Sequence, residues 1–217
     1  NAGTGAISAQ VTSAGSGAAW GVYAGGIATV DNAAASSITA TASGGGDANG
    51  VFASSASVTN HGLLSATGVN AYGIQAWGDI TLNNDGHLTT TASTGSSYGV
   101  YSGGGTATVT NSSIIEASSQ GAAYGVYAST ADVTNSGSIT AASSAGGASY
   151  GVWGRDAAVT NSGAIAASNS ADGEAYGVYG LTTATVSNAS TNSITAATTG
   201  SNAYGVYGGS GATVTSN

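Results

Sequence analysis

Hydrophobic and polar residues alternate strictly along residues 131–141 of the chain. Small, apolar or amide side chains share one parity: Ala131, Val133, Asn135, Gly137, Ile139 and Ala141. Charged and hydroxyl side chains share the other: Asp132, Thr134, Ser136, Ser138 and Thr140. A period of two predicts β-strands with one buried and one wet face. The same pattern returns in residues 107–117 and 157–167, so the inward parity is kept along the chain.

A second phrase, Tyr-Gly-Val-Tyr or a close variant, recurs through the whole sequence. Its glycine stands at Gly21, Gly50, Gly73, Gly99, Gly125, Gly151, Gly177 and Gly205, with gaps of 29, 23, 26, 26, 26, 26 and 28 residues. A repeat of this length is typical of a solenoid. We therefore predict an all-β fold, a parallel β-helix of about eight coils of ~26 residues.

Each coil is expected to contain three short strands, of the types Tyr-Gly-Val-Tyr-Ala, Ala-Thr-Val-Thr and Ser-Ile-Thr-Ala, followed by a loop of variable length. Equivalent strands of successive coils should stack in parallel about 4.8 Å apart. Because a coil can bury its apolar face only against its neighbours, residues 1–217 are expected to form one β-solenoid domain.

An asparagine recurs at the corner between the second and third strands. The set is Asn32, Asn60, Asn84, Asn111, Asn135, Asn161 and Asn188. Asparagine suits a tight corner, and stacked side-chain amides can form a ladder from coil to coil. We interpret these residues as a structural corner ladder rather than a ligand site.

Aromatic residues form two columns beside the repeated glycine. One contains Tyr98, Tyr124 and Tyr150, with Asn49 as an interruption, and by parity Tyr124 is expected to point inward or lie at a corner. The other points outward and is interrupted at Gln75; its candidate contact surface is Tyr101, Tyr127, Trp153 and Tyr179. Exposed aromatics can bind a partner, but the favoured interpretation is that the rings stack on each other and stabilise the sheet.

The composition narrows the function classes. The formal net charge is −8, and Arg155 is the single basic residue other than histidine, so neither a phosphate backbone nor an anionic membrane surface is an expected partner. The chain has no cysteine, which excludes disulfides and thiolate metal sites. We expect no cofactor, no metal site and no membrane insertion by this segment, which also lacks a long apolar stretch.

The residues that could carry catalysis are few. His61 and Asp85 each follow a corner asparagine in adjacent coils, so they are expected to lie one coil apart. A His–Asp pair without a placed nucleophile is weak support for hydrolysis. Asp172 and Glu174 share a loop that is expected to be solvated, and Arg155 stands beside Asp156 as a surface pair. The chain is therefore not expected to be an enzyme.

Two phrases, residues 124–128 (Tyr-Gly-Val-Tyr-Ala) and residues 133–141 (Val-Thr-Asn-Ser-Gly-Ser-Ile-Thr-Ala), resemble passenger-domain repeats of bacterial autotransporter adhesins. The resemblance covers nearly the whole chain. It implies a right-handed β-helix on the bacterial cell surface that mediates adhesion, self-association or a biofilm matrix. The implied partners are further copies of the chain, end to end or side by side, and cell-surface glycans or proteins.

The ends of the sequence match neither a polar cap nor a finished coil, so we expect a segment of a longer repeat array or a unit that stacks into a fibre. One alternative is an ice-binding solenoid with Thr/Ser ladders. Thr108 and Thr110 fit such a ladder, whereas Asp132 and Ala158 interrupt it. The other alternative, a polysaccharide-active β-helix enzyme, lacks a catalytic cluster.

Overall fold

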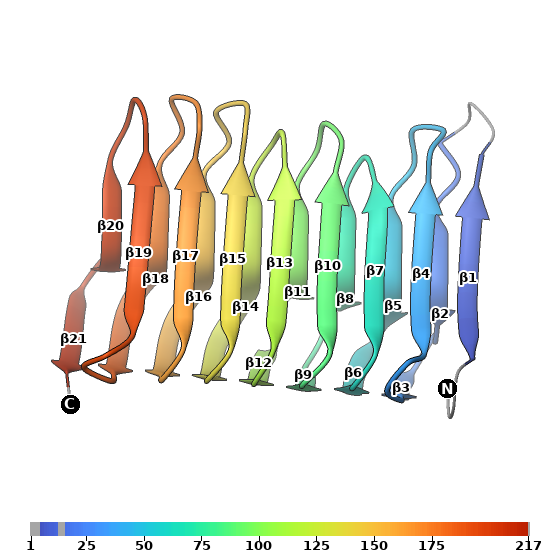
Figure 1. Cartoon of the computed structure of the whole chain (residues 1–217), viewed down its shortest axis with the longest axis horizontal. Helices are drawn as coiled ribbons and strands as arrows, with labels where there is room; N and C mark the ends of the chain where they lie inside the picture. The colour runs from blue at the N-terminus through green and yellow to red at the C-terminus, as the bar shows by residue number, and fades with distance from the viewer. Residues whose placement is uncertain (1–4, 13–15, 217) are drawn as a thin grey trace.

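The structure, a computed structural model, describes residues 5–12 and 16–216, and the regular structure in these residues is entirely β-strand. The chain winds into a β-solenoid of about eight turns with a spacing of ~26 residues, which confirms the predicted fold class. The coils advance steadily from β1 (Ala6–Val11) at one end to β21 (Gly211–Ser216) at the other (Figure 1). None of the described residues belongs to a helix that could cross a membrane.

One parallel sheet contains the third strand of each coil. Its order is β1, β4 (Ser37–Ala42), β7 (Leu63–Gly68), β10 (His87–Ala92), β13 (Ile114–Ser119), β15 (Ser138–Ser143), β17 (Ala164–Asn169) and β19 (Ser193–Thr198). The register repeats from coil to coil, so Ile115 pairs with Ile139 and Ile139 with Ile165. The repeated Ser-Ile-Thr-Ala phrase therefore fixes a continuous column of branched side chains.

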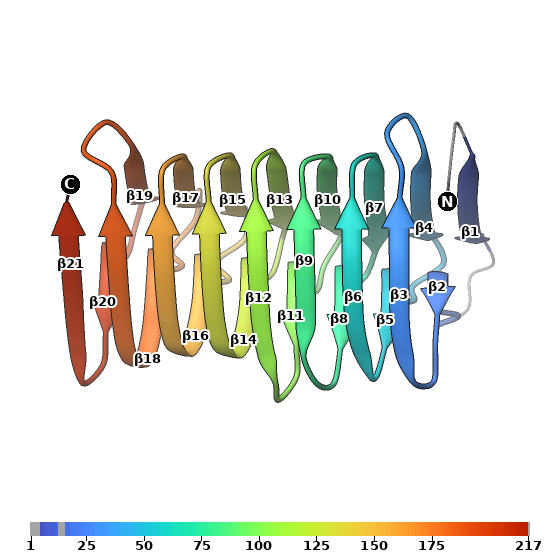
Figure 2. The ribbon, with the colours of Figure 1, turned by 90° about the horizontal axis from the view of Figure 1, so that it is seen from below.

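The other sheet contains the first and second strands of the coils (Figure 2). First strands are β2 (Ala19–Tyr23), β5 (Ala48–Ala53), β8 (Ala71–Ala76), β11 (Ser97–Ser102) and β20 (Ala203–Gly208). Second strands are β3 (Ile27–Asn32), β6 (Ser55–Asn60), β9 (Ile80–Asn84), β12 (Thr106–Asn111) and β21.

The prediction of three separate strands per coil does not hold everywhere. In three coils the first and second strands are one long strand: β14 (Ala123–Asn135), β16 (Ser149–Asn161) and β18 (Ala175–Asn188). The turn between β11 and β12 is the glycine run 103–105, whereas residues 128–131 of β14 contain no glycine. Glycine alone does not decide whether the strand is interrupted at this corner, because Gly154 and Gly180 lie inside β16 and β18.

The core lies between the two sheets and takes one branched residue from each strand. In the coil of β14 and β15 these are Val126, Val133 and Ile139, all 0–1 % exposed. Asp132 and Thr134 point outward, as the alternation predicts. The core is thin, so each coil buries its apolar surface against the coils above and below rather than within itself.

Candidate functional site

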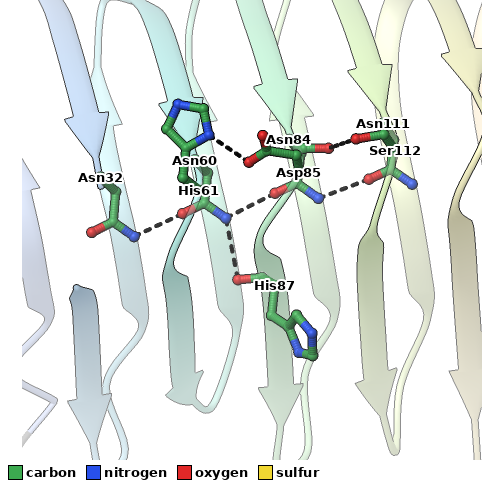
Figure 3. A network of polar contacts seen from close by, with 8 residues as sticks. All are labelled: Asn32, Asn60, His61, Asn84, Asp85, His87, Asn111 and Ser112. Carbon is green, nitrogen blue, oxygen red and sulfur yellow. Dashed lines mark hydrogen bonds and ion pairs between the residues drawn. The ribbon is translucent and has the colours of Figure 1, made fainter. Parts of the chain in front are cut away.

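The seven corner asparagines form one column along the solenoid, and Figure 3 shows its part from Asn32 to Asn111. The Nδ2 of each donates a hydrogen bond to the Oδ1 of the next, over 2.7–2.8 Å, from Asn32 to Asn188. The same nitrogen also donates to the carbonyl of the first residue in the third strand of the following coil. For example, the Asn111 Nδ2 donates to Ser138 O over 3.1 Å. The ladder thus joins the corner of each coil to two positions in the following coil.

The ladder has a direction and two unlike ends. At one end the Asn32 Oδ1 is buried and accepts no hydrogen bond from the described residues. At the other end the Asn188 Nδ2 donates within its own coil, to Asn192 O over 3.0 Å. Every amide between them both donates and accepts inside the protein, so it leaves little capacity for a ligand.

The aromatic residues form two stacked columns on the outer face of the first strands. In the column that contains the candidate contact surface, the ring centroids of Tyr101, Tyr127, Trp153 and Tyr179 are 5.1, 4.2 and 6.1 Å apart, with interplanar angles of 8–10°. In the neighbouring column, Tyr98 and Tyr124 lie 4.7 Å apart at 3°. The columns meet edge to face, and stacked and edge-to-face pairs each stabilise by about 0.5–1.5 kcal/mol.

Of the two positions expected for Tyr124, inward or at a corner, the inward one is wrong, since its ring contacts Tyr127 on the outer face with a centroid distance of 5.4 Å. The reason is the pair of residues between them. Gly125 and Val126 are both buried, which breaks the period of two and returns the next residue to the outside. A Cβ at Gly125 would lie 2.4 Å from Ile139 Cγ2 and 2.5 Å from Gly151 O, so the glycine admits the isoleucine of the third strand.

Stacking covers the faces of the rings, and most of the stacked residues are half-buried. Carbohydrate rings and bases stack on open aromatic faces, and here those faces already lie against the next coil. Burial, with the nearby phenol of Tyr179 and the carboxylate of Glu174, raises the pKa of Tyr150 to about 12. Burial likewise raises the pKa of Tyr124 and Tyr127. The hydroxyl groups of Tyr124, Tyr127 and Tyr150 are therefore neutral at physiological pH.

The columns are interrupted at Asn49 and Gln75, as the sequence indicates. Asn49 is 3 % exposed, and its Oδ1 has no hydrogen-bond partner among the described residues. Trp77, which the sequence analysis did not single out, is 61 % exposed and meets the Phe52 ring edge to face at 6.3 Å. Trp77 lies two residues after Gln75, beyond the end of β8. The repeat does not place an aromatic residue there, so its position beside the interrupted column is evident only from the structure.

The expected His61–Asp85 neighbourhood exists. The His61 Nδ1 and the Asp85 Oδ1 are 2.6 Å apart across one coil step, with side chains 44 % and 53 % exposed. His87 lies one coil away from His61 but its ring points away from the pair (Figure 3). Among residues 5–12 and 16–216, no three His, Cys, Asp or Glu side chains converge as metal ligands.

Two of the other acidic candidates, Glu174 and Asp156, make local hydrogen bonds. Glu174 accepts a hydrogen bond from the Tyr176 hydroxyl over 2.6 Å and one from Asn202 over 3.4 Å. Asp156 accepts one from Thr183 over 2.7 Å. The Glu174–Asn202 and Asp156–Thr183 contacts join neighbouring coils.

Comparisons with known proteins give no match, whether the chain is compared with family models, with curated proteins or with solved structures.

Proposed function

We propose that the chain is a structural and adhesive β-solenoid of a bacterial surface, which acts outside the cell as a stiff rod or fibre in adhesion, self-association or a biofilm matrix. The observation that carries this proposal is the Asn32–Asn188 ladder, which joins successive coils by side-chain hydrogen bonds of 2.7–2.8 Å. The resemblance of the repeats to autotransporter passenger domains supports the location and the role.

The ladders favour a mechanical role because they resist bending and separation of the coils. If two successive coils separate, backbone hydrogen bonds, an asparagine contact and aromatic contacts break together. With a rise of about 4.8 Å per coil, eight coils span roughly 40 Å. Such a rod holds whatever it displays at a fixed distance from its base.

The outward aromatic column is the proposed contact surface for a second copy of the chain or for a host surface. Its members are Tyr101, Tyr127, Trp153 and Tyr179, which present ring edges in a straight row. Aromatic residues with a polar tip are enriched at protein interfaces. Because the chain carries net charge −8, contacts of this uncharged column are favoured over contacts through the acidic loops.

Neither alternative function is favoured by a specific observation. The column of an ice-binding face would run through Thr108, Asp132 and Ala158, which the register places side by side, so a carboxylate and a methyl group interrupt the hydroxyls. A polysaccharide-active enzyme would need an acid and a base across a cleft, and Glu174 and Asp156 instead make hydrogen bonds in different coils.

The test is display of the chain on bacterial cells, with sedimentation of the cells and electron microscopy of the purified protein. We expect the wild-type chain to aggregate the cells or to form filaments. We expect Tyr127→Gln to lose whichever of these properties the wild type shows. Glutamine is compatible with this column, because Gln75 pairs with Tyr101 in the register. Thr134→Gln, on the exposed face of the same long strand, is the matched control. Monomeric rods that neither aggregate cells nor adhere to surfaces would overturn the proposal.

A further inference from the structure

One phenol of the aromatic columns is hydrogen-bonded to a carboxylate. The Tyr176 hydroxyl donates to the Glu174 Oε2 over 2.6 Å. Tyr176 is 6 % exposed, and no other tyrosine among residues 5–12 and 16–216 is buried. Asn202 of the next coil donates to the other oxygen of the same carboxylate over 3.4 Å. A base at hydrogen-bond distance can take the proton of this phenol directly, without a water molecule between them.

The ring of Tyr176 contacts both aromatic columns. It stacks on Tyr150 at a centroid distance of 5.0 Å and on Tyr204 at 5.2 Å. It also meets Tyr179 of the other column edge to face at 5.0 Å. Trp153 stacks on Tyr179 at 6.1 Å. Two successive ring contacts therefore connect an indole to the phenol that carries the base.

The composition makes these rings the first targets of oxidation. The chain contains no cysteine and no methionine, the two sulfur-containing side chains that oxidants attack. Tryptophan and tyrosine are therefore its most easily oxidised residues. Rings in contact overlap their π systems, so an electron moves readily from one ring to the next. If Trp153 loses an electron, Tyr179 replaces it, and Tyr176 in turn replaces the electron of Tyr179.

Tyr176 differs from the other rings in what happens to its proton. Burial and the hydrogen bond to Glu174 raise the pKa of Tyr176, so the reduced phenol keeps its proton at neutral pH. A phenol that has lost an electron is instead a strong acid, because its ring then carries a positive charge. The Glu174 carboxylate lies where it accepts that proton, and the low exposure of Tyr176 keeps soluble reductants and other radicals from the ring. The oxidised state therefore forms easily here and is removed slowly.

We propose that Tyr176 and Glu174 form a proton-coupled redox site that scavenges radicals through the aromatic columns. A one-electron oxidant of the radical class takes an electron from Trp153 and becomes its anion. Electrons pass from Tyr179 to Trp153 and from Tyr176 to Tyr179, the Tyr176 O–H bond breaks, and the proton moves to the Glu174 Oε2. The products are a neutral phenoxyl radical on Tyr176 and a protonated Glu174. This activity is independent of the proposed function.

The test is pulse radiolysis of the whole chain with azide radicals, which oxidise indole faster than neutral phenol. Transient absorbance follows the conversion of the tryptophan radical into a phenoxyl radical, and electron paramagnetic resonance of freeze-quenched samples measures the radical that persists. We expect a conversion whose rate does not depend on protein concentration, and a phenoxyl radical that outlives the radical of N-acetyltyrosinamide formed under the same conditions. No conversion, or a radical no longer-lived than that of the free amide, would overturn the proposal.

Three variants locate the persistent radical. Tyr176→Phe keeps the ring in the stack and removes the hydroxyl, so the persistent signal should be lost. Glu174→Gln keeps an oxygen that accepts the hydrogen bond but removes the base, and it should slow the formation of this signal about a hundredfold, the lower end of what a positioned base contributes. Tyr98→Phe is the matched control, at a stacked ring with no carboxylate partner among the described residues, and it should behave like the wild type.

Urea unfolding of the three variants verifies that each is folded, so a lost signal is not the loss of the column. A persistent signal that is unchanged in Tyr176→Phe would place the radical on another ring. An unchanged rate in Glu174→Gln would mean that water takes the proton. Either result contradicts the proposal, as does an equal loss of signal in Tyr98→Phe.

Discussion

The side-chain amide of Asn111 donates to the Oδ1 of Asn135 over 2.8 Å, although the residues are 24 positions apart in the sequence. Both side chains are 0 % exposed. The amide of Asn135 in turn donates to Asn161 over 2.8 Å. A buried amide in the middle of such a row serves two neighbours at once, so its removal affects three coils.

We therefore predict that Asn135→Ala destabilises the fold by about 2–5 kcal/mol, because it leaves a donor on Asn111 and an acceptor on Asn161 buried without this partner. Asn188→Ala, at the end of the row, leaves only the donor of Asn161 and should cost about 1–3 kcal/mol. Urea unfolding measures the free energy of unfolding of both variants, and hydrogen exchange shows which coils lose protection. Equal effects of the two variants would contradict a ladder that acts cooperatively.

Gly125 makes a prediction about packing. Gly125→Ala places a Cβ 2.4 Å from Ile139 Cγ2 and 2.5 Å from the backbone oxygen of Gly151, and a backbone oxygen cannot move aside. Overpacking of this kind costs about 1–3 kcal/mol and can cost more. The thermal midpoint should fall clearly relative to the wild type.

The matched control is Gly205→Ala in the last coil. The nearest atom to its Cβ would be Ile194 O at 3.5 Å, an ordinary contact. This variant should unfold within about 0.5 kcal/mol of the wild type. If both alanine variants behaved alike, the glycine column would reflect strand geometry in general rather than the isoleucine packed on it.

The strands and the buried parity could be predicted from the sequence because the alternation is local. Val133 and Asn135 share a parity with Ile139, and a period of two determines which side they take. The asparagine column was predictable because the same residue recurs at the same point of the repeat. Its hydrogen-bond direction was not, since that depends on the orientation of each amide.

Other features depend on neighbours in space. Tyr124 faces outward because two successive residues, Gly125 and Val126, are buried, and a strict period cannot express that. The position of Trp77 against Phe52 follows from contacts between different coils. The Ser143 Oγ has no hydrogen-bond partner among the described residues, whereas the Oγ of Ser119, its register partner, donates to Ala122 O, and the shared parity of the two serines does not indicate this difference.

The stacked phenols predict a loss of stability at alkaline pH. Burial raises the pKa of Tyr150 from 10.0 to about 12, so the folded state keeps a proton that the unfolded state releases above about pH 10. The stabilisation by this group is complete below pH 10 and is lost as the pH rises to about 12. Unfolding midpoints measured across this range should fall.

Tyr150→Phe keeps the ring in the stack and removes the ionisable hydroxyl, so the fall between pH 10 and about 12 should become shallower. Tyr23→Phe is the control for the same chemical change at a ring that is 63 % exposed, and its profile should follow the wild type. A tyrosinate absorbance titration that ends near pH 10 for every tyrosine of the folded protein would contradict the prediction.

Loss of the His61–Asp85 pair should change the free energy of unfolding only slightly, in contrast to loss of an amide from the asparagine row one residue away. Its atoms are 2.6 Å apart, but both side chains are about half exposed, and exposed ion pairs contribute about 0–1 kcal/mol. His61→Ala should therefore unfold within about 1 kcal/mol of the wild type near neutral pH, whereas Asn60→Ala, which breaks hydrogen bonds of 2.7 and 2.8 Å on either side, should lose about 2–5 kcal/mol. Urea unfolding of the two single variants compares them directly. A larger loss for His61→Ala than for Asn60→Ala would mean that the coils are held together at the surface of this corner rather than by its buried amides.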